Sequence, residues 1–314
     1  MSDKSVSLHI DDQLVTVPEG TTILEAARTV NIDIPTLCWA ENLTPVNVCR
    51  LCVVEAEGAR TLIPACSRTC EEGAAVYTQS DRVRDNRRMV LELLDSANDL
   101  SQSEELQSLI SDYGADKDRY TDPATAATAP KVEDDLFVRA YERCVLCYKC
   151  VEACGEDAQF TFAIAIAERG FDARVSTEHD VPLPESACVY CGNCIGVCPT
   201  NALQFKSEFD MREAANWRPE EQSVTETICS FCGVGCTLEL HTQDNKIVKV
   251  TSPADHSVTS GHLCVKGRFG WQYVQARFIE DRRPMQASLL NNFAAGARVG
   301  ILAAPSDVKV LTFL

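Results

Sequence analysis

The chain has 314 residues, of which 17 are cysteine, and a formal net charge of −17 at pH 7. Nucleic-acid binding depends on Lys and Arg side chains that neutralise phosphates, so this charge argues against a nucleic-acid partner. No apolar run approaches the length of about 18 residues that a membrane span needs, and the N-terminal sequence MSDKSVSLHIDD lacks the pattern of a secretory signal. We therefore expect a cytoplasmic protein with no membrane partner.

Residues 1–80 predict a small α+β domain. Residues 5–18 alternate apolar and polar side chains on both sides of Asp11-Asp12, which predicts a hairpin. Thr22 and Glu25 have the spacing of a capping box, so a helix should begin near Thr22. A cysteine-rich segment follows this helix.

Residues 81–132 form a predicted helical connector. The segment 81–114 has a helical pattern, with Ser103 as a capping residue and Gly114 as a stop. Small residues and prolines predict a linker over 121–131. The apolar side chains expected to form a packing face on the first of these helices are Val83, Met89, Val90, Leu91, Leu93 and Leu94.

Four cysteines of the first domain have the spacing C-x10-C-x2-C-x13-C. Four thiolates in loops after a small sheet suit a 2Fe–2S cluster, although four cysteines can also hold a structural zinc ion. A further cysteine, Cys70, has no quartet of its own, and it is a spare ligand, an alternative to Cys66 or a thiol without a role. The predicted ligands are Cys38, Cys49, Cys52 and Cys66.

Residues 133–215 contain two runs of C-x2-C-x2-C-x3-C, the pattern of a bacterial-type ferredoxin with two 4Fe–4S clusters. In this pattern the fourth cysteine of each run binds the other cluster. The close spacing lets three thiolates wrap around one cluster, with backbone N–H groups near its sulfurs. One predicted ligand set is Cys144, Cys147, Cys150 and Cys198, and the other is Cys188, Cys191, Cys194 and Cys154.

Residues 222–282 contain a fourth quartet with the spacing C-x2-C-x3-C-x27-C. Two strands are predicted over 236–243 and 246–252, around an Asp244-Asn245 turn. The tail, 283–314, is moderately apolar and predicts one or two more strands, without the glycine pattern of a nucleotide site. The predicted ligands of the fourth quartet are Cys229, Cys232, Cys236 and Cys264.

Two sets of motifs resemble known families. The segments IPTLCWAENLTPVNVCRLCVVE and PACSRTC resemble the N-terminal domain of the large iron–sulfur subunit of respiratory complex I, a domain that iron-only hydrogenases and NAD-dependent formate dehydrogenases share. The segments TICSFCGVGCTLEL and GHLCVKGRFG resemble the 4Fe–4S domain of molybdopterin oxidoreductases, above all formate dehydrogenases. In that family the lysine matching Lys266 lies between cluster and pterin, which makes Lys266 a predicted cofactor-binding residue. Without a pterin to face, it is instead a cation beside the cluster or an exposed charge.

The resemblance implies an α+β chain with four parts. These are a β-grasp 2Fe–2S ferredoxin domain, a helical connector, a bacterial-type ferredoxin domain with two 4Fe–4S clusters, and a small 4Fe–4S domain of molybdopterin-oxidoreductase type. The expected cofactors are therefore one 2Fe–2S and three 4Fe–4S clusters, about 14 irons in all.

Two departures from these families bear on function. Such proteins usually have a further cluster held by one histidine and three cysteines, but residues 71–143 contain neither residue type. No cysteine follows Cys264, and only 44 residues follow Gly270, too few for a molybdopterin domain or an iron-only hydrogenase site. We therefore expect an electron-transfer subunit with no substrate site of its own.

The resemblance also implies partners. One is an FMN subunit that reacts with NAD(P)H, accompanied by a small thioredoxin-like 2Fe–2S subunit. The second redox partner is a set of hydrogenase subunits or ferredoxin, in a soluble complex of a kind that includes electron-bifurcating ones. One alternative is a formate dehydrogenase chain whose molybdenum domain is elsewhere, and another is a zinc-stabilised scaffold without a redox role.

Overall fold

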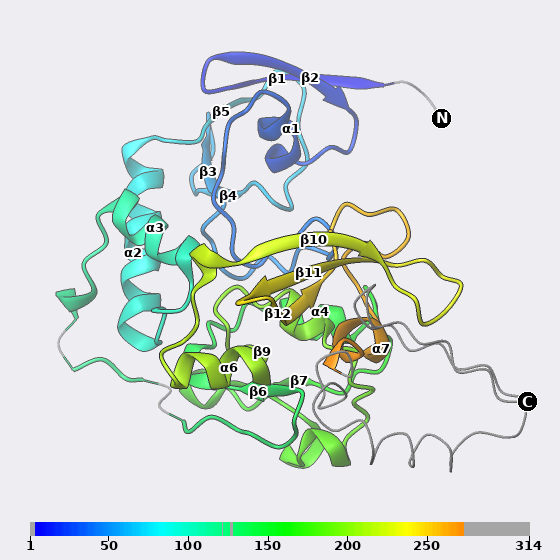
Figure 1. The fold of residues 1–314 in the computed structure, drawn as a ribbon. Helices are drawn as coiled ribbons and strands as arrows, with labels where there is room; N and C mark the ends of the chain where they lie inside the picture. Colours follow the sequence, from blue (N-terminus) through cyan, green and yellow to red (C-terminus); the bar gives the residue numbers. More distant parts are fainter. Residues whose placement is uncertain (1–3, 121, 126–127, 273–314) are drawn as a thin grey trace, which may run out of the picture.

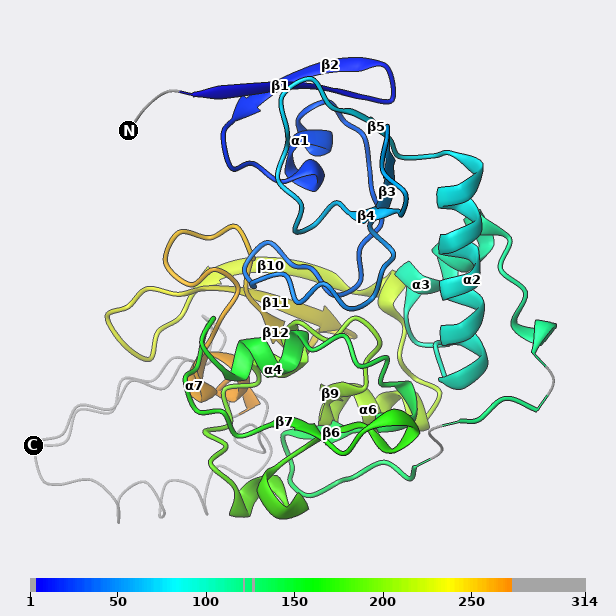
Figure 2. The same ribbon diagram turned by 180° about the vertical axis from the view of Figure 1, so that it is seen from behind.

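The computed structural model describes residues 4–120, 122–125 and 128–272. Figure 1 shows the N-terminal strands at one end of the molecule, two long helices at one side, and the later sheets and short helices at the other end. The view from behind in Figure 2 shows the same arrangement. Within the described ranges, no helix is long and apolar enough to cross a bilayer.

The first domain begins with the predicted hairpin. Strand β1 (Ser5–Ile10) pairs antiparallel with β2 (Gln13–Pro18) across Asp11-Asp12, both of which have positive φ. Helix α1 (Ile23–Thr29) follows Thr22 and has the predicted capping box, so both predictions are confirmed. The sheet has the order β2-β1-β5-β3-β4, and its other strands are β3 (Val53–Ala56), β4 (Ile63–Pro64) and β5 (Ala75–Tyr77).

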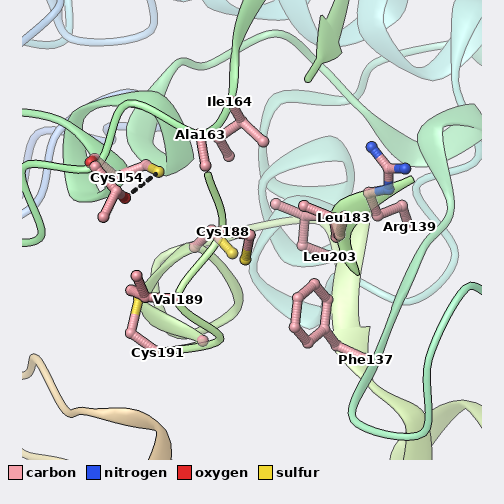
Figure 3. Close-up of a pocket in the computed structure, with 13 residues that line it drawn as sticks. Phe137, Arg139, Cys154, Ala163, Ile164, Leu183, Cys188, Val189, Cys191 and Leu203 are labelled. Atoms are coloured by element: carbon pink, nitrogen blue, oxygen red, sulfur yellow. Dashed lines mark hydrogen bonds between the residues drawn. The ribbon is translucent and has the colours of Figure 1, made fainter. Parts of the chain in front are cut away.

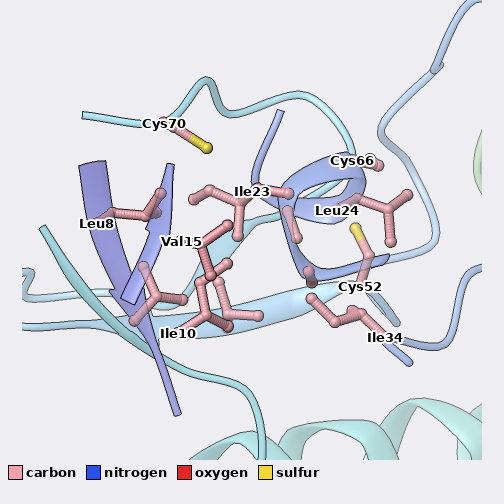
Figure 4. Packing of buried hydrophobic residues seen from close by; sticks show 14 of the residues in the cluster. Leu8, Ile10, Val15, Ile23, Leu24, Ile34, Cys52, Cys66 and Cys70 are labelled. Carbon is pink, nitrogen blue, oxygen red and sulfur yellow. The ribbon is translucent and has the colours of Figure 1, made fainter. Parts of the chain in front are cut away.

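Apolar side chains between α1 and the sheet form the core of this domain, shown in Figure 4. Leu8 and Ile10 point inward from β1, and Leu24 of α1 belongs to the same buried cluster. The side chains of Cys52 and Cys66 belong to the same buried cluster. Folding of this core therefore fixes the position of two thiols of the first quartet.

The connector consists of α2 (Asp81–Ala97) and α3 (Glu104–Tyr113). The Ser103 hydroxyl caps α3, and Gly114 ends it in the left-handed conformation, as predicted. These two helices pack against each other beside the first domain.

The predicted packing face of α2 is only partly right. Val83 and Leu91 are buried, but Met89 and Leu93 are 46% and 49% exposed. Residues four apart share one face of a helix, so Val83, Arg87 and Leu91 form the buried face and Met89 and Leu93 lie on another. The buried position between Val83 and Leu91 is occupied by the charged residue Arg87. A pattern of apolar residues does not predict a buried arginine.

The third region is built on a short antiparallel pair, β6 (Phe137–Arg139) and β9 (Leu203–Phe205). Helices α4 (Lys149–Cys154) and α5 (Asn193–Gly196) pack against each other, one in each cysteine run. A second pair, β7 (Ala165–Ala167) and β8 (Arg174–Ser176), lies between them in the sequence, and α6 (Lys206–Glu213) follows β9. Short 3-10 helices in the described part of the chain are Lys117–Arg119, Tyr141–Arg143, Gly170–Asp172, Glu178–Asp180, Leu183–Glu185 and Pro219–Glu221.

The last region is a three-stranded antiparallel sheet followed by a short helix. Strands β11 (Thr237–Gln243) and β12 (Lys246–Thr251) confirm the two predicted strands. Strand β10 (Ser223–Ile228) pairs with β11 and was not predicted, because all its side chains are exposed and it has no buried face. Helix α7 (Val265–Phe269) lies against β12. The predicted strands of 283–314 and the end of the predicted 222–282 domain lie outside the described residues.

Candidate iron–sulfur sites

The structure gathers the four thiols of the first quartet. Cys38, Cys52 and Cys66 are buried and Cys49 is half-buried. The Cys49 N–H donates to the Cys38 Sγ at 3.5 Å. The side chain of Cys49 and the neighbouring backbone N–H groups lower the pKa of Cys38 well below its ordinary value. The Cys66 thiol interacts electrostatically with the other three, so the donor set fits a 2Fe–2S cluster.

Arg87 of α2 holds the loop of this site, and it was missed from the sequence. Its guanidinium is fully buried and donates to the carbonyls of Leu51 and Val53, each at 3.0 Å, on either side of Cys52. It also donates to the Tyr113 hydroxyl at 2.8 Å. The connector therefore supports the first site through a hydrogen-bonded cation, a role that no spacing motif indicates.

The two ferredoxin-type runs have the same backbone path. The second and fourth residues after the first cysteine of each run have positive φ: Leu146 and Tyr148 in one run, Tyr190 and Gly192 in the other. In each run, backbone N–H groups two residues on hydrogen-bond to the first and second thiols. Alternation of right- and left-handed residues turns successive N–H groups inward, a concavity that binds anions such as iron–sulfur clusters.

The thiols of the two runs are exchanged between two neighbouring cavities. Cys154 of the first run lines one cavity with three cysteines of the second run, and Cys198 of the second run lines another with three of the first. Figure 3 shows the cavity of Cys154, with the thiols of Cys188 and Cys191 on one side and Cys154 on another. These two groups coincide with the ligand sets that the spacing predicts, and their binding of clusters remains a prediction.

Each fourth cysteine faces a threonine hydroxyl. The Cys154 Sγ lies 3.3 Å from Thr161 Oγ1, the contact drawn as a dashed line in Figure 3. The Cys198 Sγ lies 3.8 Å from Thr200 Oγ1. Hydrogen bonds to sulfur are one of the factors that set the potential of an iron–sulfur cluster.

Burial makes these thiols hard to ionise in the absence of iron. It raises the pKa of Cys144 to about 12 and that of Cys147 to about 11, and it raises the pKa of Cys150 and Cys194 well above the ordinary value. A metal binds the thiolate, so loading of iron must release protons from these groups. The cavities thus suit a group that itself supplies the positive charge.

The fourth quartet is more open. Cys229 is buried and Cys236 half-buried, whereas Cys232 and Cys264 are exposed. The Cys236 thiol interacts electrostatically with the other three, so these four side chains lie together. Cys264 immediately precedes α7, and Lys266 is an exposed residue of that helix.

Arg268 is a second functional candidate that the sequence did not reveal. It is 1% exposed, and its guanidinium donates to Asn193 Oδ1 and to the Val250 carbonyl, each at 3.2 Å. It interacts electrostatically with Cys191 and Cys194. Burial lowers its pKa to about 10, so it remains charged at neutral pH. Nothing in the sequence distinguishes this arginine from a surface one.

Cys70 shares the buried core cluster of Cys52 and Cys66, and the charged group with which its thiol interacts is Glu25. Its thiol packs in the core of the first domain, its N–H donates to the Thr21 carbonyl at 2.9 Å, and burial raises its pKa. Figure 4 shows it across α1 from Cys66.

Among the described residues, no three thiol, imidazole or carboxylate groups converge as they do around a single metal ion.

Three family models match the chain. They are a 2Fe-2S iron-sulfur cluster binding domain over residues 3–81, a 4Fe-4S dicluster domain over 143–202, and a molybdopterin oxidoreductase Fe4S4 domain over 222–276. The chain is an array of iron–sulfur domains. This finding confirms the fold class and the resemblance predicted from the cysteine motifs, and it shows that the array contains 2Fe–2S and 4Fe–4S domains.

Relatives of the array include components of pyridine-nucleotide oxidoreductases. One NADH-quinone oxidoreductase component of Rhizobium meliloti is 34% identical over 290 residues, covering 89% of this chain and 33% of the relative. The alpha component of the NADPH-Fe(3+) oxidoreductase of Geobacter sulfurreducens is 35% identical over 280 residues, covering 86% of this chain and 32% of the relative. The chain thus spans about a third of the length of these relatives.

A solved structure also resembles the array. It is the crystal structure of an NAD+-reducing NiFe-hydrogenase in the H2-reduced state, with a TM-score of 0.58 and 28% sequence identity. The similarity covers 65% of this chain and 88% of the matched chain.

Proposed function

We propose that this chain relays electrons between a flavin-containing partner that reacts with NAD(P)H and a second redox partner, either a hydrogenase or ferredoxin. The observation that supports this most is the exchange of Cys154 and Cys198 between two neighbouring thiol-lined cavities. Bound iron–sulfur clusters supply one-electron chemistry, while the protein holds them and sets their potentials.

The proposal assigns one 2Fe–2S and three 4Fe–4S clusters to the sixteen quartet cysteines. The first quartet would hold the 2Fe–2S cluster, the two exchanged sets one 4Fe–4S cluster each, and the fourth quartet the last, with Lys266 as a nearby cation. The predicted domain boundaries, 1–80, 81–132, 133–215 and 222–282, belong to this assignment. The third 4Fe–4S cluster rests on the four thiols around Cys236 and on the Fe4S4 domain match.

Contacts between the sites support the passage of electrons from one site to another. Cys38 of the first quartet and Cys147 of the first ferredoxin-type set belong to one buried cluster, and their thiols interact electrostatically. Cys150 and Cys194 link the two ferredoxin-type sets in the same way. Arg268, four residues after Cys264, lies next to the second of these sets. Each of the four sites therefore lies next to at least one other.

The partners follow from the names of the relatives and from the resemblance. Relatives named for NADH and NADPH support an FMN subunit with a small thioredoxin-like 2Fe–2S companion on one side. The hydrogenase match supports hydrogenase subunits on the other, with ferredoxin as the alternative acceptor. We place the complex in the cytoplasm, without nucleic acid or membrane as a partner.

The test is the metal content of the purified chain and the identity of what purifies with it. Anaerobically prepared protein should contain about 14 irons and an equal amount of acid-labile sulfide, and its visible colour should bleach on reduction with dithionite. Mass spectrometry of co-purifying proteins should find a flavin subunit. Zinc in two or more quartets would contradict the proposal.

A second candidate is a formate dehydrogenase chain with a molybdenum domain elsewhere. It is favoured by the match of residues 222–276 to a molybdopterin oxidoreductase domain. Molybdenum or tungsten together with pterin in the purified complex would select this function over a hydrogenase-linked relay.

A further inference from the structure

Helix α7 joins two cluster regions. It begins directly after Cys264 of the fourth quartet, and its Arg268 and Phe269 are buried against the ferredoxin-type region. The Phe269 ring lies 6.1 Å from that of Phe137 and 5.7 Å from that of Phe205. The last region is thus anchored next to the second 4Fe–4S set by two consecutive side chains.

Arg268 contacts the segment between two predicted ligands, Cys191 and Cys194. Asn193, between Cys191 and Cys194, accepts from Arg268 at 3.2 Å and also from the Leu263 N–H at 2.9 Å. A Cβ atom at Gly192 would come within 2.8 Å of Arg268 Cγ, and one at Gly196 within 3.3 Å of its terminal nitrogen. The absence of side chains at these two positions lets the guanidinium approach the loop.

The charge of Arg268 is poorly compensated by protein groups. Its described partners are the amide of Asn193 and the carbonyls of Val250 and Gly261, while its Nε is buried without a partner. Among the described residues no carboxylate lies within ion-pair distance, and Glu239 interacts with it only at longer range. A buried cation without a counter-ion is costly, which calls for negative charge nearby.

Arg139 offers a comparison at the same cavity. It too is 1% exposed and lines the cavity of Cys154, but it forms an ion pair with Glu133. Near the other ferredoxin-type cavity, the cation that interacts with Cys147 is Lys149, which is not buried. Arg268 is therefore the buried, uncompensated cation among these three.

We infer that Arg268 is a positioning residue that raises the reduction potential of the cluster held by Cys154, Cys188, Cys191 and Cys194. The inference rests on the proposed function, since it requires clusters at these sites. Reduction adds one electron to a group already made anionic by four thiolates. A fixed cation nearby favours the reduced form, and no proton is needed.

The test is a redox titration followed by electron paramagnetic resonance in Arg268→Met and Arg268→Lys variants of the whole chain. In R268M one 4Fe–4S signal should shift to lower potential by about 59 mV, a tenfold change in its one-electron equilibrium constant. R268K keeps the charge and should retain most of the wild-type potential. Arg218→Gln removes one charge from a surface ion-pair network and should shift nothing.

A second set of variants shows which cluster changes its potential. It also keeps the inference testable if R268M fails to load iron. In the background of Cys232→Ser, which should lack the last cluster, the R268M shift should persist. If R268M does not load iron, Asn193→Asp places a carboxylate on the guanidinium and should give the same downward shift. Unchanged potentials in loaded R268M or in N193D would overturn the inference, whereas wild-type protein without iron would overturn the proposed function itself.

Discussion

Each site of the ferredoxin-type pair and the fourth site has four thiols, but the sites differ in how far these thiols are enclosed. In the pair, Cys147 and Cys150 are each 8% exposed, and backbone N–H groups and threonine hydroxyls surround the sulfurs. At the fourth site, Cys232 and Cys264 are exposed, and Val234 nearby is 60% exposed. In the proposed relay, exposure rather than ligand spacing would separate a site that keeps electrons within the chain from one that exchanges them with a partner.

Serine substitutions at one enclosed thiol and at one open thiol should show the largest difference between the enclosed sites and the fourth site. Cys150→Ser should remove about four irons and lower the thermal midpoint by about 10 °C, because Cys150 is part of the core that both enclosed sites share. Cys232→Ser should remove as much iron but lower the midpoint by about 3 °C or less. Iron analysis and calorimetry check this, and equal loss of stability in the two variants would contradict it.

The stability of the first site should depend on the helical connector, and that of the fourth site should not. Arg87→Met leaves the carbonyls of Leu51 and Val53 without their buried donor, and we expect a loss of about 3 kcal/mol of unfolding free energy. The 2Fe–2S signal should be lost first on heating. Arg84→Met, at an exposed position of the same helix, is the control and should cost about 0.5 kcal/mol or less. Denaturant unfolding would measure both, and similar costs would contradict this role for Arg87.

The enclosed thiols also predict that stability depends on pH in the iron-free protein but not in the loaded protein. Burial raises the pKa of Cys144 to about 12 and of Cys147 to about 11, from 9.0. Neutral thiols therefore contribute stability below pH 9 that is lost as the pH rises through the raised values. The iron-free chain should lose about 3 kcal/mol between about pH 8 and pH 10.

The loaded chain should lack this loss, because iron already holds the thiols deprotonated. Unfolding midpoints of the two forms at both pH values measure the difference. A parallel decline in both forms would show that other groups cause the pH dependence.

A change at the N-cap of α1, outside the four quartets, should have the smallest effect and leave the comparison intact. Thr22→Ala removes the N-cap of α1 and its hydrogen bonds with Glu25, at a cost of about 1 kcal/mol. Iron content and potentials should stay at wild-type values. Loss of iron in T22A would mean that the first site depends on α1 more than its contacts indicate.

Local sequence signals predicted the elements that local chemistry determines. The Asp11-Asp12 turn, the Thr22 cap, the Gly114 stop and the strands around Asp244-Asn245 each depend on a few neighbouring residues, and the structure has all of them. The cysteine spacing likewise anticipated which thiols lie together, although their ligation remains a prediction.

The features that the sequence did not predict depend on distant parts of the chain. Arg87 and Arg268 are buried because carbonyl and amide groups far along the chain accept their hydrogen bonds. Met89 has the character of a core residue but lies on a face of α2 with no neighbour to cover it. Strand β10 exists because β11 offers it an edge, while its own pattern has no buried side.

The most direct test of the account is an anaerobic redox titration of the purified whole chain, with iron and sulfide measured in the same sample. We predict about 14 irons per chain and reducible signals from one 2Fe–2S and three 4Fe–4S clusters. Colourless protein with zinc in its quartets, or iron that no reductant affects, would contradict the claim that this chain relays electrons.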